Sequence, residues 1–393
     1  MLAIRARHAF DGVDVWLEGA VVLVEGGRIV GMEPIGFTPP DGTEVVEIDG
    51  TVLPGLVNAH VHLCGDSRDG ALERLPEFSA DHLDAVISTA LRCQLASGVT
   101  TVRDLGDPSW SVVDRRDAPR AGEPHIVASG PPITSVGGHC WMMGGEVAGV
   151  DALRAAVRER AERRVDVVKI MASGGNMTPG TDVGATQFTL DELRAVVDES
   201  HRLGLRVTAH AHALAAVEQA IEAGVDGIEH CTCLTAEGID FSSDLMARLS
   251  RARIDVCPTL GRAPGVLPPP RVREMLERFN MTYETRNAIV AAAHAAGVCI
   301  VSGDDGGITN AKPHGIFAEA LIGLHKGGVS ASETLASATS VAAQGCGVGD
   351  RKGRLRAGYD ADLVVVDGDA TTDITALRSV SAVFLRGERA ALV

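Results

Sequence analysis

Aromatic residues are scarce in this sequence: they make up 3 % of its 393 residues, although hydrophobic residues reach 45 %. Any core must therefore consist mostly of aliphatic side chains.

Basic residues are also few, with 36 Lys and Arg against 52 Asp and Glu, and the formal net charge is −16. This charge argues against nucleic acid and anionic membranes as partners, since both attract basic surfaces. No apolar run reaches the roughly 20 residues that span a bilayer. A small-molecule partner is the remaining expectation.

The eight cysteines contain no C-x-x-C pair, and most of them stand in apolar surroundings. This usage is typical of reduced, buried thiols. The N-terminus also lacks the charged and then apolar order of a signal peptide. Both observations predict a cytoplasmic protein.

The two ends of the chain share one pattern, and the middle has another. Residues 1–52 and 350–393 contain short apolar strands separated by glycine-containing turns. Residues 53–349 alternate apolar strands with helical stretches, which is the pattern of a parallel α/β fold. We therefore predict one small sheet domain made from both ends and one larger α/β domain between them.

Eight strands are expected in the middle of the chain, at residues 53–59, 99–103, 125–129, 166–171, 205–209, 225–229, 254–257 and 298–302. Helices are expected between most of them, for example at residues 81–97, 151–164, 190–203 and 213–223. Several of these helices end before a glycine that suits a helix C-terminus. Eight such units predict a (β/α)8 TIM-like barrel. An open doubly wound sheet would need a phosphate loop or a dinucleotide fingerprint, and the sequence contains neither.

Polar residues collect at the ends of these strands, where barrel enzymes place their chemistry. His60 and His62 end the first strand, and alternation along a strand sends both side chains to one face. Such a pair can bind one metal ion, or it can be an ordinary pair satisfied by hydrogen bonds. His210, His230 and the doubled Asp304-Asp305 end later strands. Their convergence at one rim favours a metal site.

Lys169 lies within an apolar strand, on the same face as Val167 and Met171. An ammonium group that points into a barrel is costly unless it is paired or neutralised. One interpretation pairs Lys169 with Asp304 or Asp305. The other is that its amine reacts with carbon dioxide, and the resulting carbamate bridges two metal ions.

Residues 55–62, 168–170, 228–230 and 302–307 resemble the metal-binding motifs of the amidohydrolase superfamily of metal-dependent hydrolases. The resemblance extends over nearly the whole chain, and residues 358–365 are similar to the small β-sandwich that accompanies the barrel in many members. Residues 98–106, 136–139 and 169–175 resemble the branch that holds imidazolonepropionase-like proteins and metal-dependent dipeptidases of Xaa-Pro or Xaa-Arg/Lys type. The terminal halves are accordingly expected to form a β-sandwich.

The resemblance implies a binuclear metal centre with zinc as the first choice, whose ligands are His60, His62, Lys169, His210, His230 and Asp305. His60, His62 and Asp305 would bind one ion, and His210 and His230 the other. Carbamylated Lys169 would bridge the two ions. A hydroxide between the ions would attack a carbonyl, and Asp305 would carry the proton to the departing nitrogen. The family usually has Thr or Ser at the position of Asp304, which is why Asp305 is the expected ligand.

Other residues are candidates for contact with the substrate. His139, in a glycine-flanked loop, would donate a hydrogen bond to the substrate carbonyl or the developing oxyanion. His212 would lie next to the ligands and orient one of them. The remaining candidates are Trp141, Asn176 and His314. The proline-rich residues 261–273 are either a lid or wall of the site or a plain surface loop.

The leading hypothesis is therefore a binuclear metal hydrolase that cleaves an amide or peptide C–N bond in a small substrate. Dipeptides, N-acyl amino acids, lactams and cyclic imides all remain open as substrates. The first alternative is a mononuclear deaminase or cyclic-amide hydrolase of the imidazolonepropionase kind, which would not need Lys169. The second is an inactive barrel that serves as a binding or assembly protein. The resemblance also implies a homo-oligomer.

Overall fold

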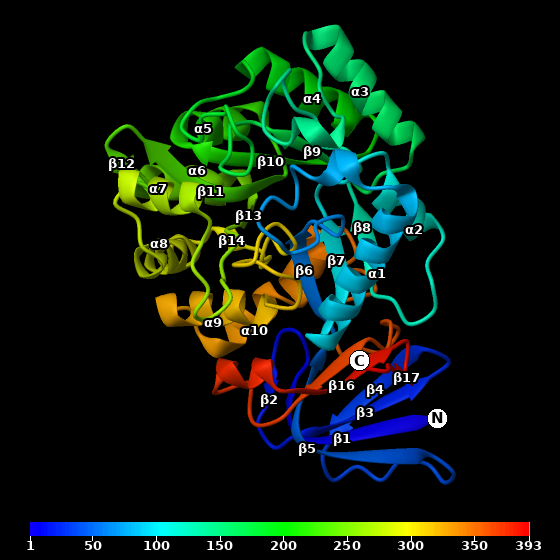
Figure 1. Ribbon diagram of the computed structural model, residues 1–393. Coiled ribbons are helices and arrows are strands. Elements are labelled where there is room, and N and C mark those ends of the chain that lie inside the picture. The colour runs from blue at the N-terminus through cyan, green and yellow to red at the C-terminus, as the bar shows by residue number, and fades with distance from the viewer. Residues whose placement is uncertain (393) are drawn as a thin grey trace.

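The computed structural model describes residues 1–392 and divides into a sheet of terminal strands and a larger α/β part (Figure 1). Strands from both ends of the chain form the terminal sheet, in which they follow one hydrogen-bonded path (Figure 1). The strands of this sheet are β1 (Leu2–Phe10), β2 (Val15–Trp16), β3 (Ala20–Glu25), β4 (Arg28–Pro34), β5 (Glu44–Pro54), β15 (Leu363–Val366), β16 (Val380–Leu385) and β17 (Glu388–Arg389).

The long strand β5 joins the two ends of the chain. Its first part pairs in parallel with β1, and its last residues, Thr51 to Pro54, pair antiparallel with β15. Strands from both ends pack around one apolar cluster that includes Ile4, Val22 and Leu363. Within residues 1–392 these strands follow one hydrogen-bonded path, β17-β16-β15-β5-β1-β3-β4, with β2 on β1. A shared terminal sheet is therefore present, but its arrangement as a β-sandwich is not confirmed.

The α/β part has strands at all eight expected positions. They are β6 (Leu56–Val61), β7 (Val99–Asp104), β8 (His125–Ala128), β9 (Val167–Met171), β10 (Arg206–Ala213), β11 (Gly227–Thr235), β13 (Asp255–Cys257) and β14 (Cys299–Ile300). Neighbours pair in parallel in two sheets, β6-β7-β8 and β14-β13-β11-β10-β9. The short β12 (Gly238–Ile239) adds to β11 in the antiparallel direction.

The two sheets are not closed into one continuous barrel. At one gap β14 is only two residues long, and the chain then continues as an irregular segment whose Gly306 forms an isolated bridge with Val61. At the other gap, the chain beyond β8 reaches β9 through an isolated bridge between Ile133 and Ile170. Regular strand pairing is lost at both gaps because the chain leaves extended geometry there. The parallel α/β fold is confirmed, and complete barrel closure is not.

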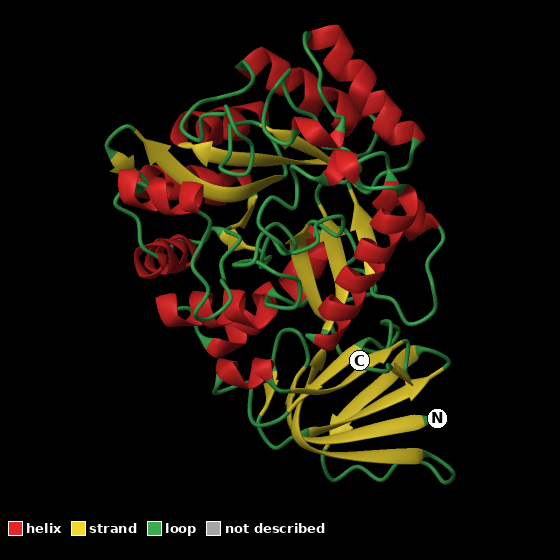
Figure 2. Ribbon diagram, in the orientation of Figure 1, coloured by secondary structure: helices red, strands yellow, loops and turns green. Residues whose placement is uncertain are grey.

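Helices flank the strands on the outside (Figure 2). They are α1 (Ala80–Ala96), α2 (Ser111–Asp117), α3 (Val150–Glu162), α4 (Leu190–Arg202), α5 (Leu214–Ala223), α6 (Ser243–Ala252), α7 (Pro270–Arg278), α8 (Tyr283–Ala295), α9 (Phe317–Gly327), α10 (Ala331–Ser337) and α11 (Ser340–Gly345). Short 3-10 helices span Leu75–Glu77, Trp141–Met143 and Ile374–Arg378. No helix among the described residues is long and apolar enough to cross a membrane.

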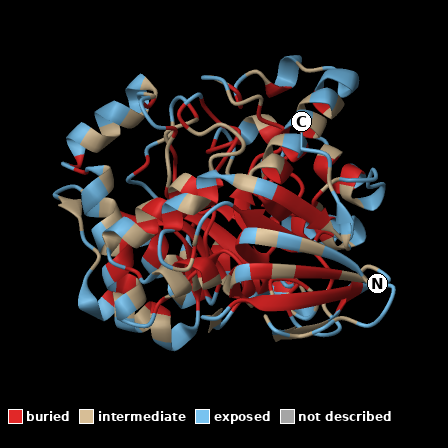
Figure 3. Ribbon diagram, turned by 90° about the horizontal axis from the view of Figure 1, so that it is seen from below, coloured by how far each residue is buried: buried red, intermediate tan, exposed pale blue. Residues whose placement is uncertain are grey.

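Local sequence signals explain where these helices begin and end. Thr189 and Glu192 form a capping box at the start of α4, with each side chain bonded to the other residue's backbone N–H. Gly224 ends α5 with a φ of 81°, a left-handed conformation that glycine adopts without steric cost. Buried positions lie on the central strands, and exposed ones follow the outer faces of the helices (Figure 3).

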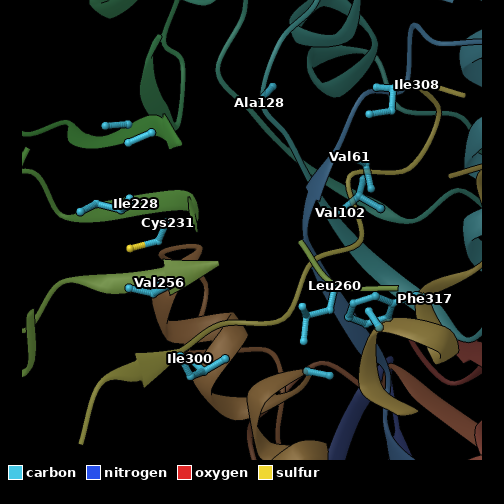
Figure 4. Close-up of a cluster of buried hydrophobic side chains, with 14 of the residues drawn as sticks. Val61, Val102, Ala128, Ile228, Cys231, Val256, Leu260, Ile300, Ile308 and Phe317 are labelled. Carbon is cyan, nitrogen blue, oxygen red and sulfur yellow. The ribbon is translucent and has the colours of Figure 1, made fainter. Parts of the chain in front are cut away.

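The core of the α/β part is aliphatic, as the composition predicts. Val61 and Val102 lie on β6 and β7, and Ile228, Val256 and Ile300 lie on three strands of the other sheet (Figure 4). All five side chains are buried. Because the apolar side chains occupy this interior, the polar residues at the carboxyl ends of the strands are left to surround a cavity.

Candidate active site

A cavity of about 820 Å³, open to solvent, lies at the carboxyl ends of the strands. Its lining contains all six predicted metal ligands, which are His60, His62, Lys169, His210, His230 and Asp305. These residues are separated by up to 245 positions in the chain. The fold therefore brings together the complete predicted ligand set.

His60, His62 and Asp305 form the first group of possible donors. Oδ1 of Asp305 lies 3.4 Å from Nε2 of each histidine. The backbone N–H of Asp305 donates to the carbonyl of His60 over 2.8 Å, which fixes the acid beside the end of β6. Burial raises the pKa of Asp305, but the adjoining His60 and His62 outweigh burial and hold the pKa below its usual value. Asp305 is thus an anionic carboxylate that faces two imidazoles.

His210, His212 and His230 form the second group, with possible donor atoms within 4.8 Å of one another. The ring of His230 lies 4.5 Å from the rings of both His210 and His212. Nδ1 of His230 is bonded to the Thr259 hydroxyl over 2.8 Å, so its Nε2 is left for another partner. Burial lowers the pKa of His210 and of His230 well below the ordinary histidine value. Neutral imidazoles are the form that binds metal ions.

Lys169 on β9 lines the cavity together with both groups. The residue is only 1 % exposed, and within residues 1–392 its Nζ makes no hydrogen bond or ion pair. Burial lowers the pKa of this amine, which favours the neutral form. The expected ion pair with Asp304 or Asp305 is absent, so that interpretation of Lys169 is wrong.

Asp304 does not line the cavity. Its Oδ1 accepts hydrogen bonds from Asn58 Nδ2 and from the backbone N–H of Gly306, both over 2.9 Å. The side chain is fully buried, and burial raises its pKa to about 6. Of the two neighbouring acids, only Asp305 borders the cavity.

Comparison with known proteins connects this arrangement to one family. The sequence profile of the amidohydrolase family matches residues 51–390. The chain belongs to the amidohydrolase family. Membership in this family suggests a hydrolase that acts on C–N bonds, and the family is generally metal-dependent. The histidine and aspartate groups of the cavity agree with that requirement.

Individual amidohydrolases support the predicted branch. Ochratoxinase from Aspergillus niger is 26 % identical, and the alignment covers 84 % of this chain and 73 % of the relative. Imidazolonepropionase from Stenotrophomonas maltophilia is 24 % identical over 93 % of this chain and 89 % of its own length. The structure of a Xaa-Pro dipeptidase with bound methionine superposes with a TM-score of 0.86, at 26 % identity and 99 % coverage of both chains. The predicted resemblance to imidazolonepropionases and dipeptidases is confirmed.

A buried charge network next to the site was not predicted from the amidohydrolase sequence. Glu229 Oε2 lies 2.7 Å from His60 Nδ1, and Glu229 Oε1 accepts hydrogen bonds from Arg103 Nη2 over 2.9 Å and from the Thr208 hydroxyl over 2.6 Å. Arg103 does not pair with its chain neighbour Asp104, whose carboxylate accepts the backbone N–H groups of Leu63 and Gly106. The one feature of the sequence that could have indicated this network is Glu229, an acid inside the apolar strand that ends in His230.

The predicted substrate contacts of this amidohydrolase are only partly brought together. His139 and Asn176 line the cavity, and His139 Nδ1 is bonded to the Thr178 hydroxyl over 2.9 Å. Trp141 lies outside the lining and is 44 % exposed. His314 is also outside the lining, and its Nε2 contacts the carbonyl of Gly65 over 3.1 Å.

The proline-rich segment 261–273 forms part of the cavity wall through Arg262, Pro268, Pro269 and Val272. This observation favours the wall or lid over a plain surface loop. Besides Lys169, the lining contains three basic residues, which are Arg262, Arg286 and Lys312. No basic cluster was predicted, because these residues come from separate segments with no common motif.

Proposed function

We propose that this amidohydrolase cleaves an amide or peptide C–N bond in a small substrate of the dipeptide or N-acyl amino acid type. The single observation that carries the proposal is Lys169, a buried and unpaired amine that lines the same cavity as two groups of possible metal donors. A one-metal deaminase or cyclic-amide hydrolase has no need of such a group. The likeness to a Xaa-Pro dipeptidase over the whole chain supports the same choice.

The donor set fits two divalent ions, with zinc as the expected metal. His60, His62 and Asp305 would hold one ion, since two imidazoles and a carboxylate are typical zinc ligands. His210 and His230 would hold the other, and His212 lies close enough to contribute or to orient them.

Lys169 would become a shared ligand of both ions. Its neutral amine adds to carbon dioxide and releases one proton, which leaves an anionic carbamate in place of a cation. The burial that lowers the pKa of Lys169 favours this reaction, because only the unprotonated amine has a free electron pair. The carbamate would also remove the cost of an unpaired buried ammonium group.

When bound, the metal ions would supply a hydroxide at neutral pH and polarise the scissile carbonyl. Asp305 would accept the proton of the attacking water and deliver it to the departing nitrogen. His139 is positioned to stabilise the carbonyl oxygen, because Thr178 holds its Nδ1 and the ring lines the cavity. Burial lowers the pKa of His139 to about 3, so it would act as a neutral hydrogen-bond donor.

The test is the metal content per chain of the purified protein, recorded with its native intact mass. We expect two metal ions and a mass increment of one carbon dioxide, both of which are lost in Lys169→Ala. Lys326→Ala is the matched control, because Lys326 is exposed on α9. The wild type and Lys326→Ala should hydrolyse dipeptides and N-acyl amino acids, and Lys169→Ala should not.

Other outcomes would identify the alternatives. One metal ion with unmodified, dispensable Lys169 would contradict the binuclear mechanism and favour a deaminase or cyclic-amide hydrolase. Absence of both metal and turnover would favour a binding or assembly protein. The division into residues 1–52 with 350–393 and residues 53–349, and the homo-oligomeric state, stay predictions.

A further inference from the structure

Three cations line one side of the cavity without an acidic partner. Arg262 follows β13, Arg286 lies on α8, and Lys312 follows the irregular segment after β14. They are brought together only by the fold. We call Arg262, Arg286 and Lys312 the cation cluster.

Neutral groups hold two of these side chains in place. Lys312 Nζ donates to the carbonyl of Thr259 over 2.8 Å and to the carbonyl of Asp304 over 2.6 Å. Arg262 Nη1 donates to a carbonyl in its own loop over 2.7 Å, and its guanidinium stacks over the Tyr283 ring at 4.6 Å. These contacts fix the directions of the side chains but leave their charges uncompensated.

Arg286 links the cluster to the proposed metal centre. Its Nη2 donates to the carbonyl of Pro258 and lies 3.4 Å from the Thr259 hydroxyl. The same hydroxyl is bonded to His230 Nδ1 over 2.8 Å. An anion bound to Arg286 would therefore lie beside the group of histidines that includes His230.

All three cations are partly buried, and a charge that is partly removed from water is stabilised by a counter-charge. No member of the cluster forms an ion pair with any acid in the described part of the chain, although acids outnumber bases in the sequence. Asp305 is the acid that faces the cavity, but its carboxylate lies against His60 and His62. The missing counter-charge is thus expected to come from a ligand.

The wall also contains apolar residues, among them Leu72, Met171, Met177, Val272 and Met275. A ligand that fits this wall combines an anionic group with a hydrophobic side chain. We propose that the cation cluster binds the carboxylate of the substrate, and that the substrate class is an N-acyl amino acid or dipeptide with a free carboxylate and an apolar side chain. Lactams and cyclic imides that carry no carboxylate are then excluded. This inference rests on the proposed function and refines it.

Arg286 is the central residue for the test, because a guanidinium binds a carboxylate through two parallel hydrogen bonds. Zinc-loaded enzyme is assayed with N-acetyl-L-leucine and a panel of apolar dipeptides, each compared with its carboxamide. We expect the acids to be preferred in kcat/KM by at least about 10-fold, as for hydrogen bonds between charged groups. Arg286→Gln should remove most of this preference through KM, and Arg286→Lys should restore part of it.

The matched control is Arg273→Gln, because Arg273 is exposed on α7 and does not line the cavity. It should retain the wild-type preference for acids. Circular dichroism and the unfolding temperature identify any variant that fails to fold. Equal turnover of acids and carboxamides by the wild-type enzyme would overturn this inference and leave the proposed function intact.

A second measurement separates the two proposals if no compound in the panel is cleaved. Calorimetry of the metal-free protein with N-acetyl-L-leucine and with its carboxamide measures binding without catalysis. Binding of the acid alone, lost in Arg286→Gln and kept in Arg273→Gln, would support the carboxylate site even though the hydrolase proposal had failed. Equal binding of both compounds, or of neither, would overturn the inference.

Discussion

Replacing Glu229 by Gln keeps the shape of the side chain but removes a buried negative charge that three groups share. Arg103 would lose its ion-pair partner, and His60 would lose the carboxylate that orients its ring. Breaking a buried ion pair by removing one partner costs about 3 kcal/mol or more, because the other charge stays buried and uncompensated. We expect Glu229→Gln to lower the free energy of unfolding of the metal-free protein by about that amount.

The same change should weaken metal binding. Groups that hold a histidine ligand in its tautomer and orientation contribute about 10- to 100-fold in metal affinity. Urea unfolding of the metal-free protein measures the first effect, and competition with a chelator measures the second.

A double variant distinguishes the two effects. Arg103→Met combined with Glu229→Gln leaves no unpaired charge, so its stability should exceed that of Glu229→Gln alone. Its metal affinity should stay low, because His60 still lacks its carboxylate partner. The reasoning would be refuted if the double variant were no more stable than the single one, or if metal affinity recovered with stability.

Three further predictions concern other parts of the molecule. His139→Gln should lower kcat by about 100-fold with unchanged metal content, as expected for loss of one donor to the developing oxyanion; a matching loss of metal would contradict this role. Burial, together with the nearby Lys352 and Arg351, lowers the pKa of His125 to about 4, so stability is lost as the pH falls below the ordinary histidine value of about 6.5. At pH 5 this loss is about 2 kcal/mol, and urea unfolding of His125→Gln should show a smaller fall between pH 7 and pH 5 than the wild type. Trp141→Ala should change kcat/KM less than about twofold, because the side chain lies outside the cavity; a large loss in steady-state assays would place Trp141 in the substrate path.

Much of the candidate site was predictable because strand geometry is a local property. His60 and His62 lie two positions apart, and alternation along a strand sends both to one face whatever the rest of the chain does. His210, His230 and Asp305 each follow an apolar strand, and the carboxyl ends of parallel strands meet at one rim. The eight strands were located by the same apolar pattern.

The pairing of the terminal strands and the positions of the loop residues were less predictable. Pairing of β5 with both β1 and β15 depends on hydrogen bonds between the two ends of the chain, which no local pattern specifies. Trp141 and His314 were expected near the substrate from their place in the chain alone. A loop after a strand can turn toward the cavity or away from it, and packing of the surrounding side chains decides which.

The sequence by itself determined the parallel α/β fold, the family and the residues that could bind metal, because these follow from short-range periodicity and from motifs of a few residues. Only the tertiary structure decided which charges meet. Arg103 and Glu229 are 126 positions apart, and the cation cluster draws on three segments that share no pattern. Electrostatic interactions depend on distance in space, so the partners of buried charges become known only when the chain is folded.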